Sequence, residues 1–219
     1  AFILLIQGNE ETYSAVYTTV YVSTFSIILS LFMGLPLGFV LSYYDFMGKK
    51  QIRAFVDTLL ALPTVVVGLL VYAFITSRGP LGDYGLLFNR SGIIVGQTIL
   101  ILPMVISLSA SAIESLDERL RNTLITLGAR GKKIITGTLY ESRFAIMTAA
   151  AAAYGRAISE VGVSIMVGGN IKWHTRTITT AIALETGKGE FAMGIALGIV
   201  LLLIGFIVNW LLIFLRKRG

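Results

Sequence analysis

Two ionisable residues, Arg156 and Glu160, stand inside a long apolar run of the sequence. They are four positions apart, so on a helix they lie one turn apart on the same face and can neutralise each other. Ionisable groups inside a membrane are costly to bury and commonly mark transport paths. Two hypotheses stay open. The pair is either a clamp that fixes the fold and a gate, or Arg156 lines a path for an anion while Glu160 limits its trapping.

Several uncharged polar residues accompany this pair. Gln97 and Ser159 are further candidates for a path or gate, although helix-to-helix hydrogen bonds are the more common use of such side chains. Asn170, Lys172 and Arg176 follow in a polar stretch, where they are candidates for contact with an outside partner or for a solvated loop. The sequence has one histidine and no cysteine, which excludes disulfides, thiol catalysis and cysteine metal sites, and one imidazole makes no metal site.

A polar segment from Glu114 to Arg143 interrupts the apolar sequence and carries six of the eighteen basic residues. Ser115 and Glu118 have the spacing of a capping box at a helix start. An apolar helical face follows, formed by Leu116, Leu120, Leu124 and Leu127. Gly128 comes next and is suited to end that helix. A second short helix is predicted from Ile134, Ile135 and Leu139. Two amphipathic helices around a glycine indicate a docking element.

The rest of the chain must hold these groups in a membrane. Hydrophobic residues make up 55% of the 219 residues and charged residues only 14%, whereas soluble domains carry about 25% charged residues. Segments of 18 or more nearly uncharged residues are long enough to cross a bilayer. We therefore predict one all-α domain over residues 1–219, a polytopic membrane protein with about five spans, near Val16–Tyr43, Ala54–Ile75, Gly92–Ile113, Phe144–Val167 and Phe191–Leu215.

The basic residues predict the orientation of these spans. With five spans the termini lie on opposite sides. The loop 45–53, the segment 114–143 and the C-terminal tail hold three, six and three basic residues, which makes twelve, whereas the loops 77–91 and 168–190 hold two and three, which makes five. Because basic residues gather in cytoplasmic loops, we expect the C-terminus and the polar segment to lie in the cytoplasm of a cell that carries this chain in its plasma or inner membrane.

The polar segment, placed between the third and fourth spans, resembles the coupling segment of ABC-importer permeases, written E-A-A-x3-G-x9-I-x-L-P. The glycine end is kept in Thr126-Leu127-Gly128-Ala129. The E-A-A positions hold Asn122, Thr123 and Leu124 instead, and the terminal proline position holds Glu141.

The run from Gly155 to Gly198 carries a more specific resemblance. Its pieces RAISEVG, GGNI, TRTITTAI and LETGKGEFA are similar to those of the molybdate, sulfate and tungstate permeases, most of all the tungstate branch. Glu141-Ser142-Arg143-Phe144 also resembles that branch, and Pro36, Pro63 and Pro103 fall in similar places.

The resemblance implies the type I ABC importer permease fold, a homodimer of this chain, two copies of a separate cytoplasmic ATPase and an extracytoplasmic binding protein that delivers the oxyanion. The sequence has no G-x-x-x-x-G-K-[ST] motif, so ATP and Mg²⁺ are expected in the partner ATPase, with no cofactor here and no enzymatic role. We expect the ATPase to contact the coupling segment through Leu124, Thr126, Leu127, Gly128, Ala129, Arg130, Lys132, Ile135 and Leu139.

Other functions remain as alternatives. Molybdate and sulfate are dianions close to tungstate in size and charge, and no residue distinguishes them on physical grounds. A secondary anion transporter is a second class, but carboxylates for ion coupling are scarce in the spans. A membrane-embedded enzyme is a third class, and the spans lack a His/Asp cluster or an activated serine.

Overall fold

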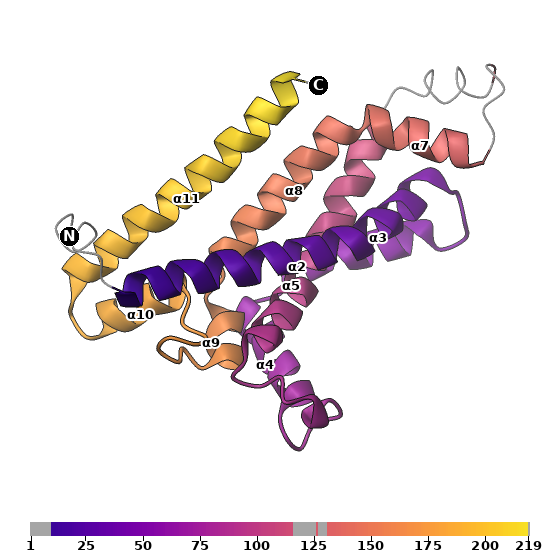
Figure 1. The fold of residues 1–219 in the computed structure, drawn as a ribbon. Helices are drawn as coiled ribbons and strands as arrows, with labels where there is room; N and C mark the ends of the chain where they lie inside the picture. The colour runs from indigo at the N-terminus through magenta and orange to yellow at the C-terminus, as the bar shows by residue number, and fades with distance from the viewer. Residues whose placement is uncertain (1–9, 116–125, 127–130, 219) are drawn as a thin grey trace.

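The computed structural model describes residues 10–115, 126 and 131–218, and the regular structure of these residues is entirely helical. Three helices are long and apolar enough to cross a membrane: α2 (Glu10–Tyr43), α5 (Arg90–Glu114) and α11, of which Phe191–Trp210 meets the test. Figure 1 shows these helices inclined to one another, with shorter helices between them. The predicted all-α membrane fold is confirmed.

Helices α2 and α5 pack closely because small residues face the contact. A Cβ atom built on Gly34 would lie 2.7 Å from Val105 Cγ1, and one on Gly38 would lie 2.2 Å from Ser109 Oγ and 2.9 Å from the Ile106 carbonyl oxygen. Glycine alone therefore allows this approach. Gly34 and Gly38 are four positions apart, a spacing that places both on one face of a helix and predicts a close helix contact. Both helices continue through their internal prolines, Pro36 and Pro103.

The second expected span, Ala54–Ile75, is not one straight helix. It divides into α3 (Lys49–Leu59) and α4 (Thr64–Ile75), which are bent by 98°. Pro63 adopts an extended conformation immediately before α4. A proline donates no backbone hydrogen bond and disfavours helical geometry at the preceding residue, which explains why the helix breaks here.

The fourth expected span, Phe144–Val167, is also broken. Helix α8 (Arg143–Ile158) ends before Ser159, and a short helix, α9 (Gly162–Gly168), follows after a turn. The stretch expected as a loop, 168–190, contains a further helix, α10 (Ile178–Gly187). Thr177 begins it with a capping box: its hydroxyl accepts from the Thr180 amide, and the Thr180 hydroxyl accepts from the Thr177 amide. The remaining described elements are η1 (Gly82–Tyr84) and α7 (Lys132–Glu141).

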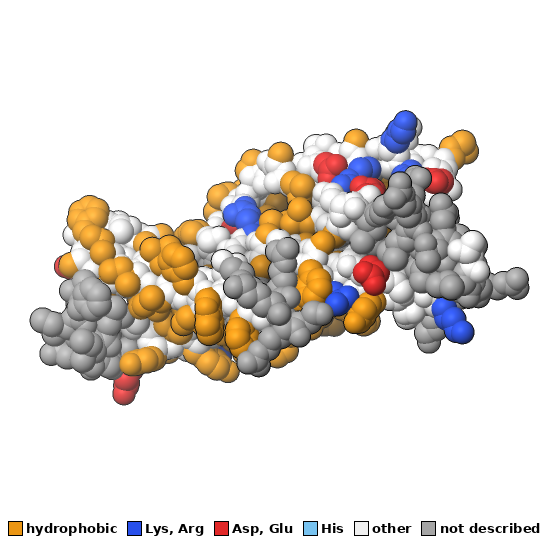
Figure 2. All heavy atoms as spheres, turned by 90° about the horizontal axis from the view of Figure 1, so that it is seen from above, with side chains coloured by type: hydrophobic (Ala, Val, Ile, Leu, Met, Phe, Trp, Pro, Cys, Tyr) orange, Lys and Arg blue, Asp and Glu red, His pale blue; other side chains and the backbone are white. Residues whose placement is uncertain are grey.

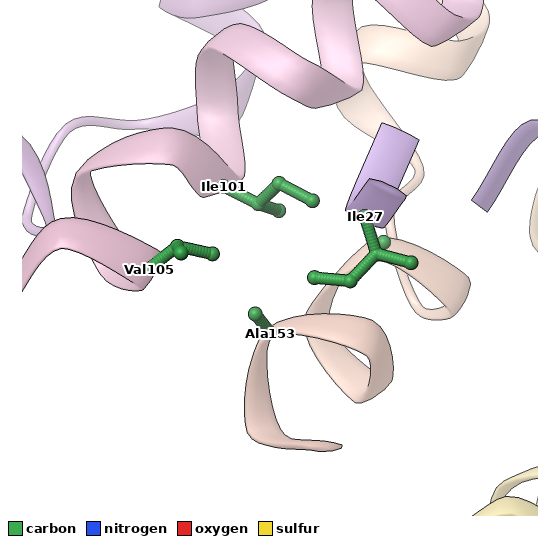
Figure 3. Packing of buried hydrophobic residues seen from close by; sticks show 5 residues of the cluster. Ile27, Ile101, Val105 and Ala153 are labelled. Atoms are coloured by element: carbon green, nitrogen blue, oxygen red, sulfur yellow. The ribbon is translucent and has the colours of Figure 1, made fainter. Parts of the chain in front are cut away.

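The hydrophobic core lies where α2, α5 and α8 meet. Ile27, Ile101, Val105 and Ala153 point toward one another from these three helices (Figure 3). A second cluster joins α4 to α9 through Val67, Val71, Ile75, Val163 and Val167, and a third joins α2, α10 and α11 through Ala15, Ile178, Ala181 and Leu197. The broken helices are thus packed against the long ones.

The two ends of the molecule differ in their elements. Figure 1 shows α7 and the C-terminal end of α11 toward one side, with α9 and α10 toward the opposite side. Hydrophobic side chains cover much of the face in Figure 2, where charged groups gather mainly toward one end. Helix α11 leaves Leu202, Phe206 and Trp210 exposed, by 64%, 69% and 66%. An apolar surface of this kind suits lipid or a second chain.

Candidate functional site

The break between α8 and α9 holds the ionisable pair. The Glu160 side chain is only 1% exposed, and its Oε1 accepts a hydrogen bond from the Val163 amide in the first turn of α9, at 3.1 Å. Arg156 Nη1 lies 3.6 Å from Glu160 Oε2, and the Arg156 side chain is 43% exposed. The two members therefore differ: Glu160 is a buried group that holds the break, whereas Arg156 reaches the surface.

Side chains from neighbouring helices bind the backbone at this break. Gln97 Nε2 of α5 donates to the Ala157 carbonyl at 3.2 Å, and its Oε1 accepts from Ser26 Oγ of α2 at 3.2 Å. Thr179 Oγ1 of α10 donates to the Glu160 carbonyl at 2.8 Å. Where a helix stops inside an apolar environment, its carbonyls need such partners.

Gln97 is thus a buried bridge among α2, α5 and α8, at 1% exposure, and it presents no free face to a passing anion. Ser159, by contrast, is exposed, and its hydroxyl donates to the Gly155 carbonyl at 2.9 Å. Of the four residues expected at a path or gate, Arg156 and Ser159 are exposed. Gln97 and Glu160 are buried and form hydrogen bonds at the break between α8 and α9. Thr179 was missed because a helix was not expected in 168–190.

The predicted coupling residues are described only in part. Leu124, Leu127, Gly128, Ala129, Arg130 and Glu118 of the expected capping box lie outside the described residues, as does the side chain of Lys132. Ser115 forms the end of α5, and its hydroxyl donates back to the Ala112 carbonyl at 2.8 Å. Thr126 is exposed and helical.

Helix α7 confirms the second short helix of that segment. Its half-buried Ile135 and Leu139 line an apolar groove of about 340 Å³ together with residues of α2 and the turn that follows it: Leu35, Pro36, Phe39, Val40 and Tyr44. One face of α7 therefore borders the same groove as α2, so the second helix of the predicted coupling segment lies beside the first long helix.

A polar cluster on α3 and α5 was not anticipated from the sequence. Arg53 donates to Ser111 Oγ at 2.6 Å and lies 3.4 Å from Glu114 Oε2 and 3.3 Å from Asp57 Oδ2. Ser107 Oγ donates to Asp57 Oδ1 at 2.6 Å. This cluster ties α3 to the last turns of α5, at the point where the predicted coupling segment begins. The signal was the Arg53–Asp57 spacing of four, which places both on one face of a helix.

The three residues expected at an outside contact lie in the turn after α9. Arg176 Nε donates to Asn170 Oδ1 at 3.2 Å and the Arg176 guanidinium pairs with Glu11 of α2. Lys172 Nζ lies 2.7 Å from the other Glu11 oxygen. Asn170, Lys172 and Arg176 are thus brought together, with Glu11 as a partner that the sequence did not indicate. No cluster of three His, Cys, Asp or Glu residues that suits a metal occurs in the described part of the chain.

Comparison with known proteins gives a consistent result. Residues 26–218 match the family model described as binding-protein-dependent transport system inner membrane component. The tungstate uptake system permease protein TupB of Campylobacter jejuni is 48% identical over 96% of this chain and 88% of its own length. The protein of the same name from Peptoclostridium acidaminophilum is 33% identical, over 100% of this chain and 96% of its own. The molybdenum transport system permease protein ModB of Escherichia coli K12 is 30% identical over 80% and 82%.

Solved structures agree on the fold. A bacterial ABC transporter that imports the polysaccharide alginate contains a chain that matches with a TM-score of 0.79 at 20% identity, covering 99% of this chain and 82% of that one. An inward-facing MetNI methionine ABC transporter gives 0.76 at 15% identity, covering 93% and 94%. At such identities the likeness concerns the fold, which is that of type I ABC importer permeases.

Proposed function

This chain belongs to the family of binding-protein-dependent transport system inner membrane components, and on that basis we propose that it is the membrane permease of an ATP-driven importer of tungstate. The assignment of tungstate as the transported anion rests on the likeness to tungstate permeases over almost the whole chain, at 48% identity in one of them. The molybdenum permease is more distant and leaves molybdate as the alternative cargo.

The chain acts as a translocating subunit, and ATP and Mg²⁺ are bound by a separate ATPase. Two copies of the permease form the membrane part, two ATPases bind on the cytoplasmic side, and a binding protein delivers the anion from outside. The basic-residue count supports a cytoplasmic C-terminus. The half-exposed side chain of Lys172 supports contact with the binding protein, beside Asn170 and Arg176, which bond to each other.

Uptake into vesicles tests this proposal. Vesicles that hold permease, ATPase and binding protein are expected to accumulate tungstate in preference to molybdate and sulfate, and only with hydrolysable ATP. Preference for molybdate would select the alternative cargo. Accumulation by the permease alone, without an ATPase, would make the chain a secondary transporter and refute the proposal.

The coupling segment transmits the ATPase motion. The stretch 124–139 is placed in a cleft of the ATPase, with basic residues that steer the partner and leucines that become buried. The groove supports this role, because Ile135 and Leu139 of α7 border it together with Phe39 and its neighbours of α2, so a displacement of α7 toward α2 would close it. Closure of the two ATPases would then tilt the spans and alternate access to the path.

Gly128→Glu tests the coupling segment separately. A carboxylate at this glycine should prevent close docking, so we expect ATP-dependent uptake to fall to background while the permease still inserts and dimerises. Ser77→Glu is the matched control, because it adds the same charge to an exposed position in a loop expected on the opposite side. Uptake by Gly128→Glu equal to that of Ser77→Glu would contradict the docking role.

Arg156 and Ser159 are the exposed candidates for the path, and Glu160 and Gln97 hold them in place. An exposed guanidinium attracts a dianion, and its i,i+4 carboxylate, at 3.6 Å, keeps that attraction moderate. Moderate binding suits a path, because an anion that enters must also leave.

A further inference from the structure

A charged cavity lies beside the start of α2, away from Arg156 and from the coupling segment. Its volume is about 330 Å³. That is roughly ten times the volume that one water molecule occupies in the liquid, about 30 Å³. Its lining comes from four parts of the chain: the start of α2, the turn that follows α9, helix α10 and the start of α11. The charged members are Glu11, Lys172, Arg176, Glu185 and Lys188.

One carboxylate bridges two cations in this cavity. Glu11 Oε2 lies 2.7 Å from Lys172 Nζ, and Glu11 Oε1 accepts from Arg176 Nη1. Each oxygen of one anion therefore has its own cation, and the two cations come from the same short turn. This is the arrangement that two oxygens of a tetrahedral oxyanion also require, since guanidinium and ammonium groups bind carboxylate and oxyanion oxygens with similar geometry.

The turn that presents the two cations is held in a fixed shape. Asn170 and Trp173 have positive φ angles of 51° and 67°, which cost energy in residues other than glycine and persist only where the surroundings enforce them. Thr175 Oγ1 accepts from the Ile171 amide at 3.0 Å, and Arg90 Nε donates to the His174 carbonyl at 2.7 Å. The backbone that carries Lys172 and Arg176 is therefore held in place before any ligand arrives, which lowers the entropic cost of binding one.

The charges of the cavity favour a dianion over Glu11. Lys172, Arg176 and Lys188 carry three positive charges, and Glu11 and Glu185 carry two negative ones, so one positive charge is in excess. Lys188 Nζ pairs with Glu185 at 2.9 Å. If a dianion took the place of Glu11 between the cations and the Glu11 carboxylate turned out to solvent, the three positive charges would face three negative ones within the cavity.

We propose that this cavity is an exchange site for a tetrahedral oxyanion dianion, and that Glu11 is the internal anion which holds Lys172 and Arg176 until the dianion displaces it. The identity of the dianion as tungstate rests on the proposed function. The cavity lies on the side of α10, where the basic-residue count places the outside, so the site would receive the anion before it reaches Arg156.

The test is equilibrium binding of radiolabelled tungstate to the assembled permease–ATPase complex in nanodiscs, without binding protein. Glu11→Gln keeps the size of the side chain and removes the competing charge, so we expect it to bind tungstate at least tenfold more tightly than the wild type. Lys172→Gln, at a half-exposed position, should bind at least tenfold more weakly. Arg78→Gln is the control, because it removes an exposed positive charge from the loop 77–91, outside the cavity, and should leave binding unchanged.

Equal or weaker binding by Glu11→Gln would make Glu11 a structural clamp and overturn the proposal. If that variant does not assemble, Glu11→Asp replaces it: the shortened carboxylate competes less well, and unchanged affinity would again contradict the site. Loss of binding-protein docking in Lys172→Gln with unchanged tungstate affinity would assign the turn to a protein partner and also overturn it. Normal tungstate uptake with no effect of these variants on binding would refute the site alone, whereas absence of oxyanion uptake in the wild type would refute the proposed function.

Discussion

Gly38→Ala probes the contact between α2 and α5 that places Gln97 beside the broken helix. The added Cβ would lie 2.2 Å from Ser109 Oγ and 2.9 Å from the Ile106 carbonyl oxygen. The Ser109 hydroxyl can rotate away only by giving up its hydrogen bonds to the carbonyls of Val105 and Ile106, and the Ile106 carbonyl belongs to the helix itself. The helices must therefore separate.

The expected cost follows from that separation. Overpacking a close contact costs roughly 1–3 kcal/mol. Replacement of glycine by alanine also favours a helix by about 1 kcal/mol, which opposes the cost. Gly198→Ala in α11 isolates the contact, because a Cβ there meets no atom within 4 Å and only the helix preference changes. We expect Gly38→Ala to be less stable than Gly198→Ala by roughly 1–3 kcal/mol.

The assay is reversible unfolding of the purified protein in detergent, followed by circular dichroism. Gly34→Ala provides a second comparison, because its Cβ would meet the Val105 side chain at 2.7 Å, which Val105→Ala removes. The double variant should recover part of the stability that the single variant loses. If Gly38→Ala and Gly198→Ala have the same stability, the two helices do not approach as closely as described, and the positions derived for Gln97 and Glu160 lose their support.

Two further predictions concern polar contacts. Arg156→Gln should raise the tungstate concentration needed for half-maximal uptake with little change in assembly. Glu160→Gln should mainly reduce the free energy of unfolding, by about 1–3 kcal/mol, because a buried charge-assisted hydrogen bond is weakened. An assembly defect in Arg156→Gln with unchanged concentration dependence would favour the clamp hypothesis. Arg53→Gln should lower the anion imported per ATP hydrolysed, because α3 loses its tie to the end of α5. Glu114→Gln should cause a smaller loss, because Arg53 keeps its bond to Ser111. An unchanged ratio in Arg53→Gln would contradict that link.

The sequence by itself determined the class of the molecule. Long apolar runs can satisfy their backbone groups in a membrane only as helices, so composition and length were enough to predict an all-α membrane protein. Gly34 and Gly38 indicated a close helix contact because their spacing places both on one face, and the structure confirms it. The motifs after Gly155 indicated the family because they are specific and follow one another in the same order as in the family.

Only the tertiary structure decided where the helices break and which polar groups meet. The stretch 144–167 is long enough for one span, and the polar residues within it, Arg156, Ser159 and Glu160, do not show where the helix ends. The break at Ser159–Val161 is stabilised by Gln97 and Thr179, which come from other helices to bind the carbonyls of Ala157 and Glu160. The pairing of Glu11 with Lys172 and Arg176 joins residues more than 150 positions apart. Local sequence carries composition and periodicity, whereas these contacts arise from packing between distant segments, so no pattern along the chain could specify them.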